Sequence, residues 1–207
     1  CNFEEIKYLG FPFSISETFQ QRNTNSSIAE SLVRVEEIQN LCVKHKKEIV
    51  VYISMAFGNP YKDEWNSDIV INWTKKLSDM GIKIIALADT IGCSTPENIT
   101  YLFSGLIPEF SRRDSYGEKV QIGAHLHSTK QKALEKIEAA YKSGCRSFDV
   151  AIHGFGGCPM AAEDLTGNMA TEDLLDFVQN NSIKLDLNTV ELTKAYELSW
   201  KVFNNYH

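Results

Sequence analysis

Apolar and polar residues follow two alternating patterns along this chain. Short, nearly continuous apolar runs are typical of strands buried on both faces, whereas apolar residues spaced by three and four are typical of amphipathic helices. The first pattern predicts strands over residues 6–11, 49–57, 83–88, 120–127 and 147–152. The second predicts helices over residues 27–47, 67–80, 129–142, 171–179 and 189–204, and Thr95-Pro96-Glu97 opens a further helix. Each predicted strand is therefore followed by a helix.

Strands that are buried on both faces and separated by helices predict a parallel α/β sheet. Two architectures fit this order of elements, a doubly wound open sheet and a stretch of a (β/α)8 barrel. The sequence has no Gly-x-Gly-x-x-Gly after the first strand and no P-loop, which weakens the nucleotide-binding version of the open sheet. No linker or low-complexity segment interrupts residues 1–207, so we expect a single domain.

The composition narrows the class of protein. The 207 residues are 43% hydrophobic and 23% charged, with a formal net charge of −6, as is typical of a globular domain. The chain has no basic patch and no apolar run of membrane-spanning length, so we expect neither nucleic acid nor a membrane as a partner. Its first residues resemble neither a signal peptide nor a transit peptide, so we expect a protein that is not secreted. Five widely spaced cysteines without a CxxC pair indicate reduced thiols.

Polar residues gather where each predicted strand ends, which is the side that carries the chemistry in parallel α/β folds. They are Ser14, Ser16, Glu17, Ser54, Asn59, Asp89, Thr90, His125, His127, Ser128, Cys158 and Asn168. Each has a plain structural alternative, such as a helix cap at Ser16-Glu17 or a left-handed turn at Asn168. One common site accounts for all of them together, and we therefore expect one.

His125 and His127 close the predicted strand 120–127. Residues i and i+2 of a strand point to the same side, so both imidazoles face one point. Neutral imidazole is the commonest side-chain ligand for a divalent metal, which makes the pair a candidate metal site. The alternative is a pair of hydrogen-bonded core histidines.

The string Gly-Phe-Gly-Gly-Cys-Pro-Met at residues 154–160 follows the last predicted strand. Its glycines permit backbone angles that other residues avoid, and Pro159 stiffens the next step. The pattern predicts a reactive Cys158 thiol on a loop at the end of a strand. The alternative is a tight turn in which Cys158 is a small buried apolar residue.

Taken together, these strings resemble the hydroxymethylglutaryl-CoA lyase family, one branch of the metal-dependent barrels that include isopropylmalate and homocitrate synthases. The likeness runs over nearly the whole chain and is carried by Ser16-Glu17-Thr18-Phe19, Phe57-Gly58-Asn59-Pro60-Tyr61, Asp89-Thr90-Ile91-Gly92, His125-x-His127, Gly154-Phe155-Gly156-Gly157-Cys158-Pro159 and Gly167-Asn168-Met169-Ala170-Thr171-Glu172-Asp173-Leu174. The Gly-Gly-Cys-Pro and Gly-Asn-x-Ala-Thr-Glu-Asp strings are specific for the lyase branch, whereas His-x-His indicates only the superfamily.

The resemblance implies cleavage of the acyl-CoA 3-hydroxy-3-methylglutaryl-CoA to acetyl-CoA and acetoacetate, with Mg²⁺ or Mn²⁺ as cofactor. This activity belongs to leucine degradation and ketone-body formation. The implied cation ligands are His125, His127 and Asn168; the implied catalytic residues are Cys158 as the thiol and His125 or Asp89 as the base; the implied substrate contacts are Ser16, Thr90, Gly156 and Gly157. We also expect a homodimer, and a cytoplasmic location in a bacterium or a mitochondrial-matrix location in a eukaryote.

The chain departs from the family's pattern in ways that change the expected fold and activity. The family's Arg-Asp pair on its first strand has no counterpart, because Arg113-Asp114 lies in a polar loop. The match begins near the fourth of eight strands, and five strands cannot close a barrel. We therefore expect about five β/α units of a (β/α)8 barrel, inactive when isolated.

Two substitutions inside the matching strings remove polar groups. His125-Leu126-His127-Ser128 stands where the family has His-Cys-His-Asp, and Ala86-Leu87-Ala88-Asp89-Thr90 stands where it has Ser-Leu-Gly-Asp-Thr. Two other interpretations stay open: a synthase of the same superfamily that condenses acetyl-CoA with a second substrate, and a non-catalytic fragment or pseudoenzyme.

Overall fold

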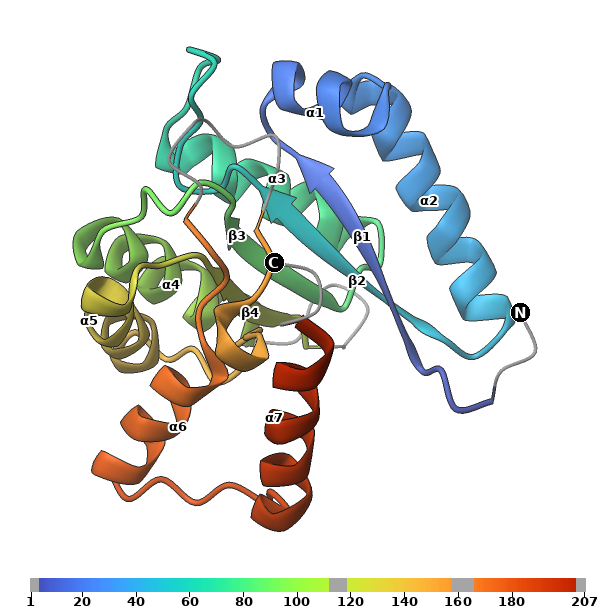
Figure 1. Cartoon of the computed structure of the whole chain (residues 1–207). Coiled ribbons are helices and arrows are strands. Elements are labelled where there is room, and N and C mark those ends of the chain that lie inside the picture. The colour runs from blue at the N-terminus through green and yellow to red at the C-terminus, as the bar shows by residue number, and fades with distance from the viewer. Residues whose placement is uncertain (1–3, 112–118, 158–165, 204–207) are drawn as a thin grey trace.

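The computed structural model describes residues 4–111, 119–157 and 166–203. In this part of the chain four strands form one parallel sheet in the order β1-β2-β3-β4 (Figure 1). The strands are Tyr8–Ser14 (β1), Glu48–Ser54 (β2), Ile84–Asp89 (β3) and Gln121–Leu126 (β4). The helices are Glu17–Thr24 (α1), Ile28–Lys44 (α2), Ser67–Asp79 (α3), Pro96–Ser111 (α4), Lys130–Lys142 (α5), Thr171–Asn180 (α6) and Thr189–Phe203 (α7), with a 3₁₀ turn at Ile152–Gly154 (η1).

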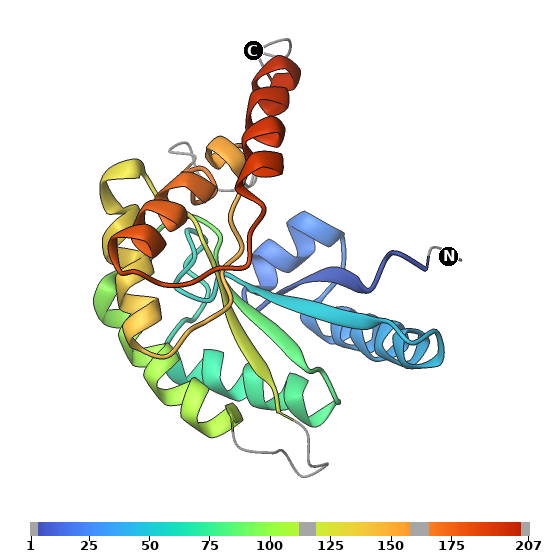
Figure 2. The ribbon, with the colours of Figure 1, turned by 90° about the horizontal axis from the view of Figure 1, so that it is seen from below.

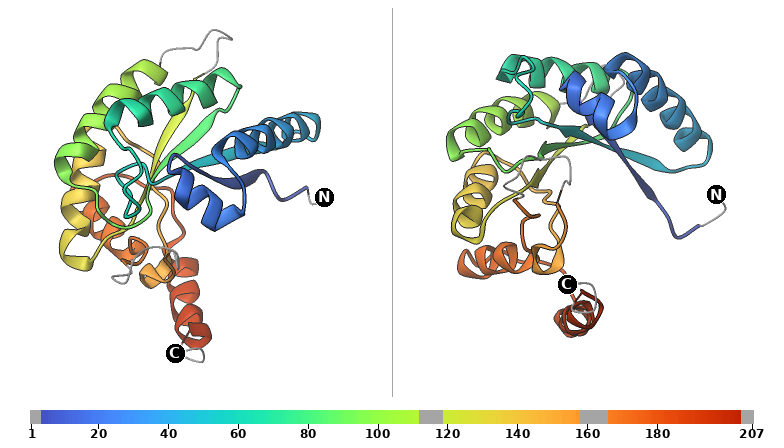
Figure 3. Two further views of the ribbon diagram at one scale, coloured as in Figure 1. Left: turned by 90° about the horizontal axis from the view of Figure 1, so that it is seen from above. Right: turned by 45° about the horizontal axis from the view of Figure 1, so that its top comes forward.

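The helices lie on the outer face of a curved sheet. Viewed from below and from above, α2 to α6 form an arc around the strands, and α7 projects from the end of that arc (Figures 2 and 3). Parallel strands with helices on the outside of a curved sheet form part of a (β/α)8 barrel. The predicted fold class is therefore confirmed, as an open segment of the barrel.

The first strand lies slightly later in the chain than the apolar pattern predicts. Its register pairs Tyr8 with Glu48 and Ser14 with Ser54, so it continues through Pro12. Proline lacks an N–H donor and is tolerated on an edge strand, because only one side of that strand must supply ladder hydrogen bonds. The apolar pattern predicts that this strand ends at Phe11, before the proline.

Two helix starts show how local chemistry sets the elements. Ser27 and Glu30 form a reciprocal capping box at the start of α2, as their spacing predicts. Ser16 caps α1, and its Oγ accepts a hydrogen bond of 3.1 Å from the amide of Phe19. The sequence indicates only a possible cap here and does not predict α1 itself, a short helix with little apolar periodicity.

The predicted fifth strand does not form an extended ladder. The segment 147–151 pairs with Ala124 through two backbone hydrogen bonds, and its Ala151 then pairs with Ala170. The chain turns toward residues 168–170 because the Ala151 amide donates to the carbonyl of Met169, at 3.0 Å, instead of to β4. The prediction of five strands is thus corrected to four strands followed by isolated bridges.

One apolar core joins the sheet to its helices. Its fully buried side chains include Phe13, Val51, Ile53, Ile85, Leu87, Val70, Leu77, Ile99, Leu102, Phe103 and Ile137. The core anchors the strand positions from which the polar strand ends project. Among the described residues, no helix combines the length and hydrophobicity needed to cross a bilayer.

Candidate active site

A cavity of about 440 Å³ opens at the carboxyl ends of the four strands. Each strand contributes to its wall: Pro12 from β1, Tyr52 and Ser54 from β2, Ala88 from β3 and His125 from β4. Of the predicted site residues, the lining contains Thr90, His125, His127, Gly157 and Asn168. The fold thus brings together residues that lie far apart in the sequence.

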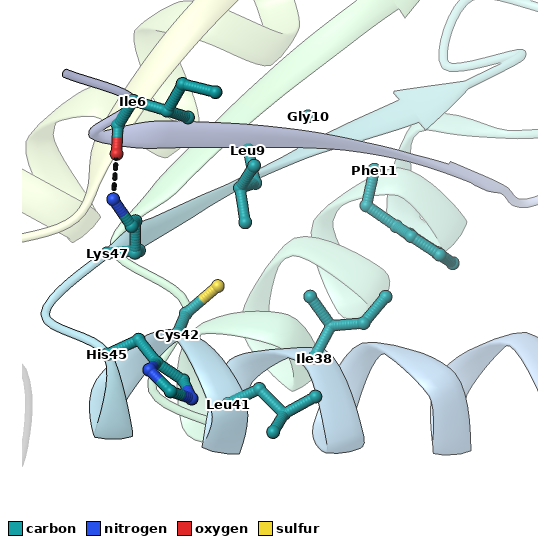
Figure 4. Close-up of a pocket in the computed structure, with 9 residues that line it drawn as sticks. All are labelled: Ile6, Leu9, Gly10, Phe11, Ile38, Leu41, Cys42, His45 and Lys47. Carbon is teal, nitrogen blue, oxygen red and sulfur yellow. Dashed lines mark hydrogen bonds between the residues drawn. The ribbon is translucent and has the colours of Figure 1, made fainter. Parts of the chain in front are cut away.

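A larger hollow of about 510 Å³ lies elsewhere, between β1 and α2 (Figure 4). Leu9 and Phe11 of β1 point across it toward Ile38, Leu41 and Cys42 of α2. Its lining is almost wholly apolar, whereas the smaller cavity at the strand ends carries the convergent polar groups that a reaction needs. We therefore assign the chemistry to the smaller one.

The two histidine rings lie edge to face at the end of β4. Their ring centroids are 5.4 Å apart, which agrees with the same-side geometry expected of positions i and i+2. His127 is buried, and its Nδ1 lies 3.1 Å from the carbonyl oxygen of Thr166. A carbonyl only accepts hydrogen bonds, so Nδ1 carries the proton and Nε2 keeps a lone pair.

The surroundings of both imidazoles favour the neutral form of the ring. Burial lowers the pKa of His125, although the nearby Asp149 carboxylate opposes the shift. Burial also lowers the pKa of His127, and the neighbouring His125 lowers it further. The free Nε2 of a neutral imidazole is the form that binds a metal ion.

Asp149 and Tyr52 form a polar pair beside His125 that the sequence analysis missed. The Oδ2 of Asp149 lies 3.8 Å from Nδ1 of His125, which is buried and has no hydrogen-bond partner among the described residues. Burial and the Asp149 carboxylate, which accepts a hydrogen bond from the phenol, raise the pKa of Tyr52 to about 12. Tyr52 therefore remains a neutral donor at the cavity wall.

The glycines of the 154–157 segment allow it to approach Asn168 closely. Gly156 has a φ of +92°, and a Cβ at this position would lie 2.8 Å from Nδ2 of Asn168. That Nδ2 donates a hydrogen bond of 2.8 Å to the carbonyl of Phe155, so the Asn168 amide oxygen is the atom left to accept a cation. Asn168 also forms an antiparallel bridge with His127. The structure therefore places the predicted ligands His127 and Asn168 side by side.

Two predicted site residues are engaged away from the cavity. The carboxylate of Asp89 is fully buried, where it accepts hydrogen bonds from Lys136 at 2.8 Å and from Ser94. Ser16 caps α1 and donates to Oδ2 of Asp63 at 2.5 Å. Neither Asp89 nor Ser16 lines the cavity. Cys158 lies outside the described residues.

Lys136 is a further residue of this region that the sequence patterns do not single out. It is 1% exposed and lies on the same face of α5 as the buried residues Ala133, Ile137 and Ala140. A lysine inside an apolar stripe was the available signal, because lysine is almost never fully buried without a partner.

The described residues fit a divalent cation as an incomplete ligand set. His125 and His127 offer neutral imidazoles, and Asn168 offers an amide oxygen. In the described ranges, no group of three or more His, Cys, Asp or Glu side chains is placed to hold a metal ion. A hard cation such as Mg²⁺ prefers oxygen ligands, so this set lacks the carboxylate that would complete it.

Comparison with known proteins places these features in a family. Residues 5–198 match the family model described as HMGL-like. The hydroxymethylglutaryl-CoA lyase YngG of Bacillus subtilis is 32% identical over 182 residues, which are 88% of this chain and 58% of that protein. The chain thus spans little more than half the length of this relative. Relatives from Danio rerio and Bos taurus, 30% and 33% identical, are named as cytoplasmic and mitochondrial forms.

Solved structures agree with the sequence match. The crystal structure of the Bacillus subtilis HMG-CoA lyase superposes with a TM-score of 0.84 at 30% identity, covering 96% of this chain and 64% of that one. An HMG-CoA lyase from Acenitobacter baumannii, solved in complex with coenzyme A and 3-methylmalate, superposes with a TM-score of 0.83 at 26% identity. The alignment covers 96% of this chain and 62% of that structure.

Proposed function

This chain belongs to the HMGL-like family, and from that premise we propose that the complete protein cleaves 3-hydroxy-3-methylglutaryl-CoA to acetyl-CoA and acetoacetate. The observation that carries the proposal is the meeting of His125, His127 and Asn168 in one strand-end cavity. An acyl-CoA substrate is supported by the relatives, one of which was solved with coenzyme A. The activity places the protein in leucine degradation and ketone-body formation.

The reaction breaks the bond between C2 and C3 of the substrate. A base removes the proton of the C3 hydroxyl, the C3 oxygen becomes the ketone of acetoacetate, and the bonding electron pair passes to C2. The resulting thioester enolate takes up a proton at C2 and leaves as acetyl-CoA. We assign that proton to the Cys158 thiol, because a thiol near its usual pKa of ~8.5 is protonated at neutral pH.

His125, His127 and Asn168 would hold a Mg²⁺ or Mn²⁺ ion. When bound, such an ion polarises the substrate's C3 hydroxyl and orients its oxygens. The hydrogen bond from Nδ1 of His127 to Thr166 aims Nε2 at the cavity. Tyr52 and Thr90 line the cavity as neutral polar groups, and Gly157 leaves its edge open to a substrate.

We propose that the base is not one of the described residues. Neutral His125 has one lone pair, and an imidazole that binds a cation through it cannot accept a proton there. No Asp or Glu of the described ranges lines the cavity. We therefore propose that the acceptor lies outside residues 4–111, 119–157 and 166–203, and that the 207-residue chain is inactive when isolated.

The test is a product assay on the complete protein. Incubation of 3-hydroxy-3-methylglutaryl-CoA with Mg²⁺ or Mn²⁺ should release acetyl-CoA and acetoacetate in equal amounts, and a chelator should stop the release. The same preparation is offered acetyl-CoA and a 2-oxo acid. Condensation of these two without cleavage of 3-hydroxy-3-methylglutaryl-CoA would overturn the lyase in favour of a synthase, and inactivity in both assays would favour a non-catalytic protein.

A further inference from the structure

Lys136 is a fully buried ammonium group that the proposed reaction does not use. It lies on α5 beside the core residues Ala133 and Ile137 and does not line the strand-end cavity. Moving a charged ammonium out of water costs several kcal/mol unless partners replace the water. The contacts that replace it show where this group acts.

All three N–H donors of Lys136 have an acceptor. Its Nζ lies 2.8 Å from Oδ2 of Asp89, 3.0 Å from the carbonyl oxygen of Gly92 and 2.9 Å from the carbonyl oxygen of His127. These acceptors come from the end of β3, from the turn that follows it and from the residue after β4. One side chain therefore ties two neighbouring strand ends together.

The same turn lies against Thr166, whose carbonyl oxygen is the hydrogen-bond partner of the His127 ring. Gly92 has a φ of +70°, and a Cβ there would lie 2.7 Å from the side chain of Thr166. The carbonyl oxygen of Thr166 is the partner of Nδ1 of His127. Lys136 thus contacts the backbone carbonyl of His127 directly and also holds the Gly92 turn, which lies against Thr166.

We propose that Lys136 is a positioning residue, which holds His127 in the orientation that binds the divalent cation. This inference rests on the metal site of the proposed function. Stability alone is a weak reason for the buried pair, because well-packed apolar residues of similar volume are often equally or more stable. Groups that orient a metal ligand from behind typically affect metal affinity 10–100-fold.

The test compares Mn²⁺ affinity in variants of the complete protein, measured by electron paramagnetic resonance without substrate. Lys136→Met keeps the length of the side chain and removes its charge. It should raise the Kd for Mn²⁺ by about 10–100-fold and lower kcat while KM stays within about twofold. The matched control is Lys142→Met on the same helix, whose ammonium forms an exposed ion pair with Glu138. Its Kd should not change.

A second variant separates positioning from charge balance. Lys136→Met leaves the buried Asp89 carboxylate without its counter-charge and so endangers folding. The double variant Asp89→Asn/Lys136→Met removes both charges and should recover the melting temperature while Mn²⁺ binding stays weak. Recovery of wild-type Mn²⁺ affinity in the double variant would make the pair purely structural and overturn the proposal. Failure of the double variant to fold would overturn it equally.

The Mn²⁺ measurement also separates this inference from the proposed reaction. Weakened Mn²⁺ binding in Lys136→Met, in a protein that cleaves no 3-hydroxy-3-methylglutaryl-CoA, would reject the reaction and keep the positioning role. Unchanged Mn²⁺ affinity in Lys136→Met, in a protein that cleaves the substrate normally, would reject the positioning role and keep the reaction. A wild-type protein that binds no Mn²⁺ would reject both.

Discussion

The two edges of the sheet differ in how far the described chain satisfies them. At the β4 edge, residues 147–151 and 166–170 pair with β4 and with each other, and their backbone groups are hydrogen-bonded across the site. At the β1 edge, Tyr8 and Leu9 are exposed, and the hollow between β1 and α2 is lined by apolar side chains (Figure 4).

The β4 edge carries the groups of the candidate site, whereas the β1 edge carries a surface suited to association. At the β4 edge, His127 is oriented by a hydrogen bond inside the described chain, and Asp149 lies 3.8 Å from Nδ1 of His125. The β1 edge exposes apolar surface and a strand whose outer side pairs with no described strand, which marks a surface that normally needs covering. Substitutions at the β4 edge should therefore change the reaction rate and the metal affinity. Substitutions at the β1 edge should change the self-association of the chain.

The largest expected effect concerns two cysteines, the proposed acid Cys158 and Cys42, which lies beside β1. Cys158→Ala in the complete protein should lower kcat by about 10²–10⁴-fold, as is typical of removing a general acid, with little change in melting temperature. Cys42, buried in the hollow beside β1, should respond in the opposite way. Cys42→Ala should cost about 1 kcal/mol of stability and leave kcat unchanged. Full activity of Cys158→Ala would make that thiol structural.

The next effect concerns two histidines. His127→Ala should weaken Mn²⁺ binding by more than about 100-fold, since loss of a ligand costs more than loss of a group behind it. His45 lines the hollow at the β1 edge, and His45→Ala should leave the affinity unchanged. Titration calorimetry on the complete protein measures both. Equal affinities for the two variants would remove His127 from the metal site.

The third effect is a change of mass at the β1 edge. The isolated 23.4 kDa chain should self-associate, so light scattering should give at least about twice that mass. Leu9→Lys combined with Leu41→Lys places charge in the hollow and should return the chain to a monomer. Leu134→Lys, at an exposed position of α5, should change nothing. A monodisperse monomer of the native sequence would show that this edge needs no cover.

The smallest effect is the pH dependence of stability at the β4 edge. Burial lowers the pKa of His125 and His127 below the value of about 6.5 expected in the unfolded chain. Between the two values the unfolded state binds more protons, so the free energy of unfolding falls as pH drops below about 6.5. The slope is at most about 1.4 kcal/mol per pH unit for each histidine. Denaturant unfolding with a chelator should give a flatter slope for His127→Gln, and an unchanged slope would contradict the prediction.

Periodicity was sufficient to predict the elements whose apolar faces enter the core. The ranges of α2, α3, α5 and α6 and of three strands follow from it, and so does the common side of His125 and His127. It failed for α1, which is capped by Ser16 but buries few apolar residues, and for the fifth strand, whose backbone finds partners outside the sheet. Those outcomes depend on tertiary hydrogen bonds that a one-dimensional pattern does not contain.

Some residues of the candidate site could likewise be predicted from the sequence, and others could not. The positions of His127, Asn168 and Gly157 around one cavity follow from the rule that parallel strands end on one side. The burial of Asp89 does not follow, because its partner Lys136 lies 47 residues later and its charge suggests an exposed position. Tyr52 does not follow from the sequence either, because it lies inside an apolar strand, where an aromatic residue normally indicates a packing role.

The order of the strands has a consequence for how the chain folds during synthesis. The register pairs Tyr8 with Glu48, Val50 with Ile84 and Ile84 with Gln121, so each strand joins the one translated 34 to 40 residues before it. No pairing inside the sheet has to wait for a distant segment to leave the ribosome. Each new β/α unit can dock on a finished edge, and the loop-closure entropy for each pairing is that of a short loop. The four described strands can therefore join the sheet in chain order at the pace of translation.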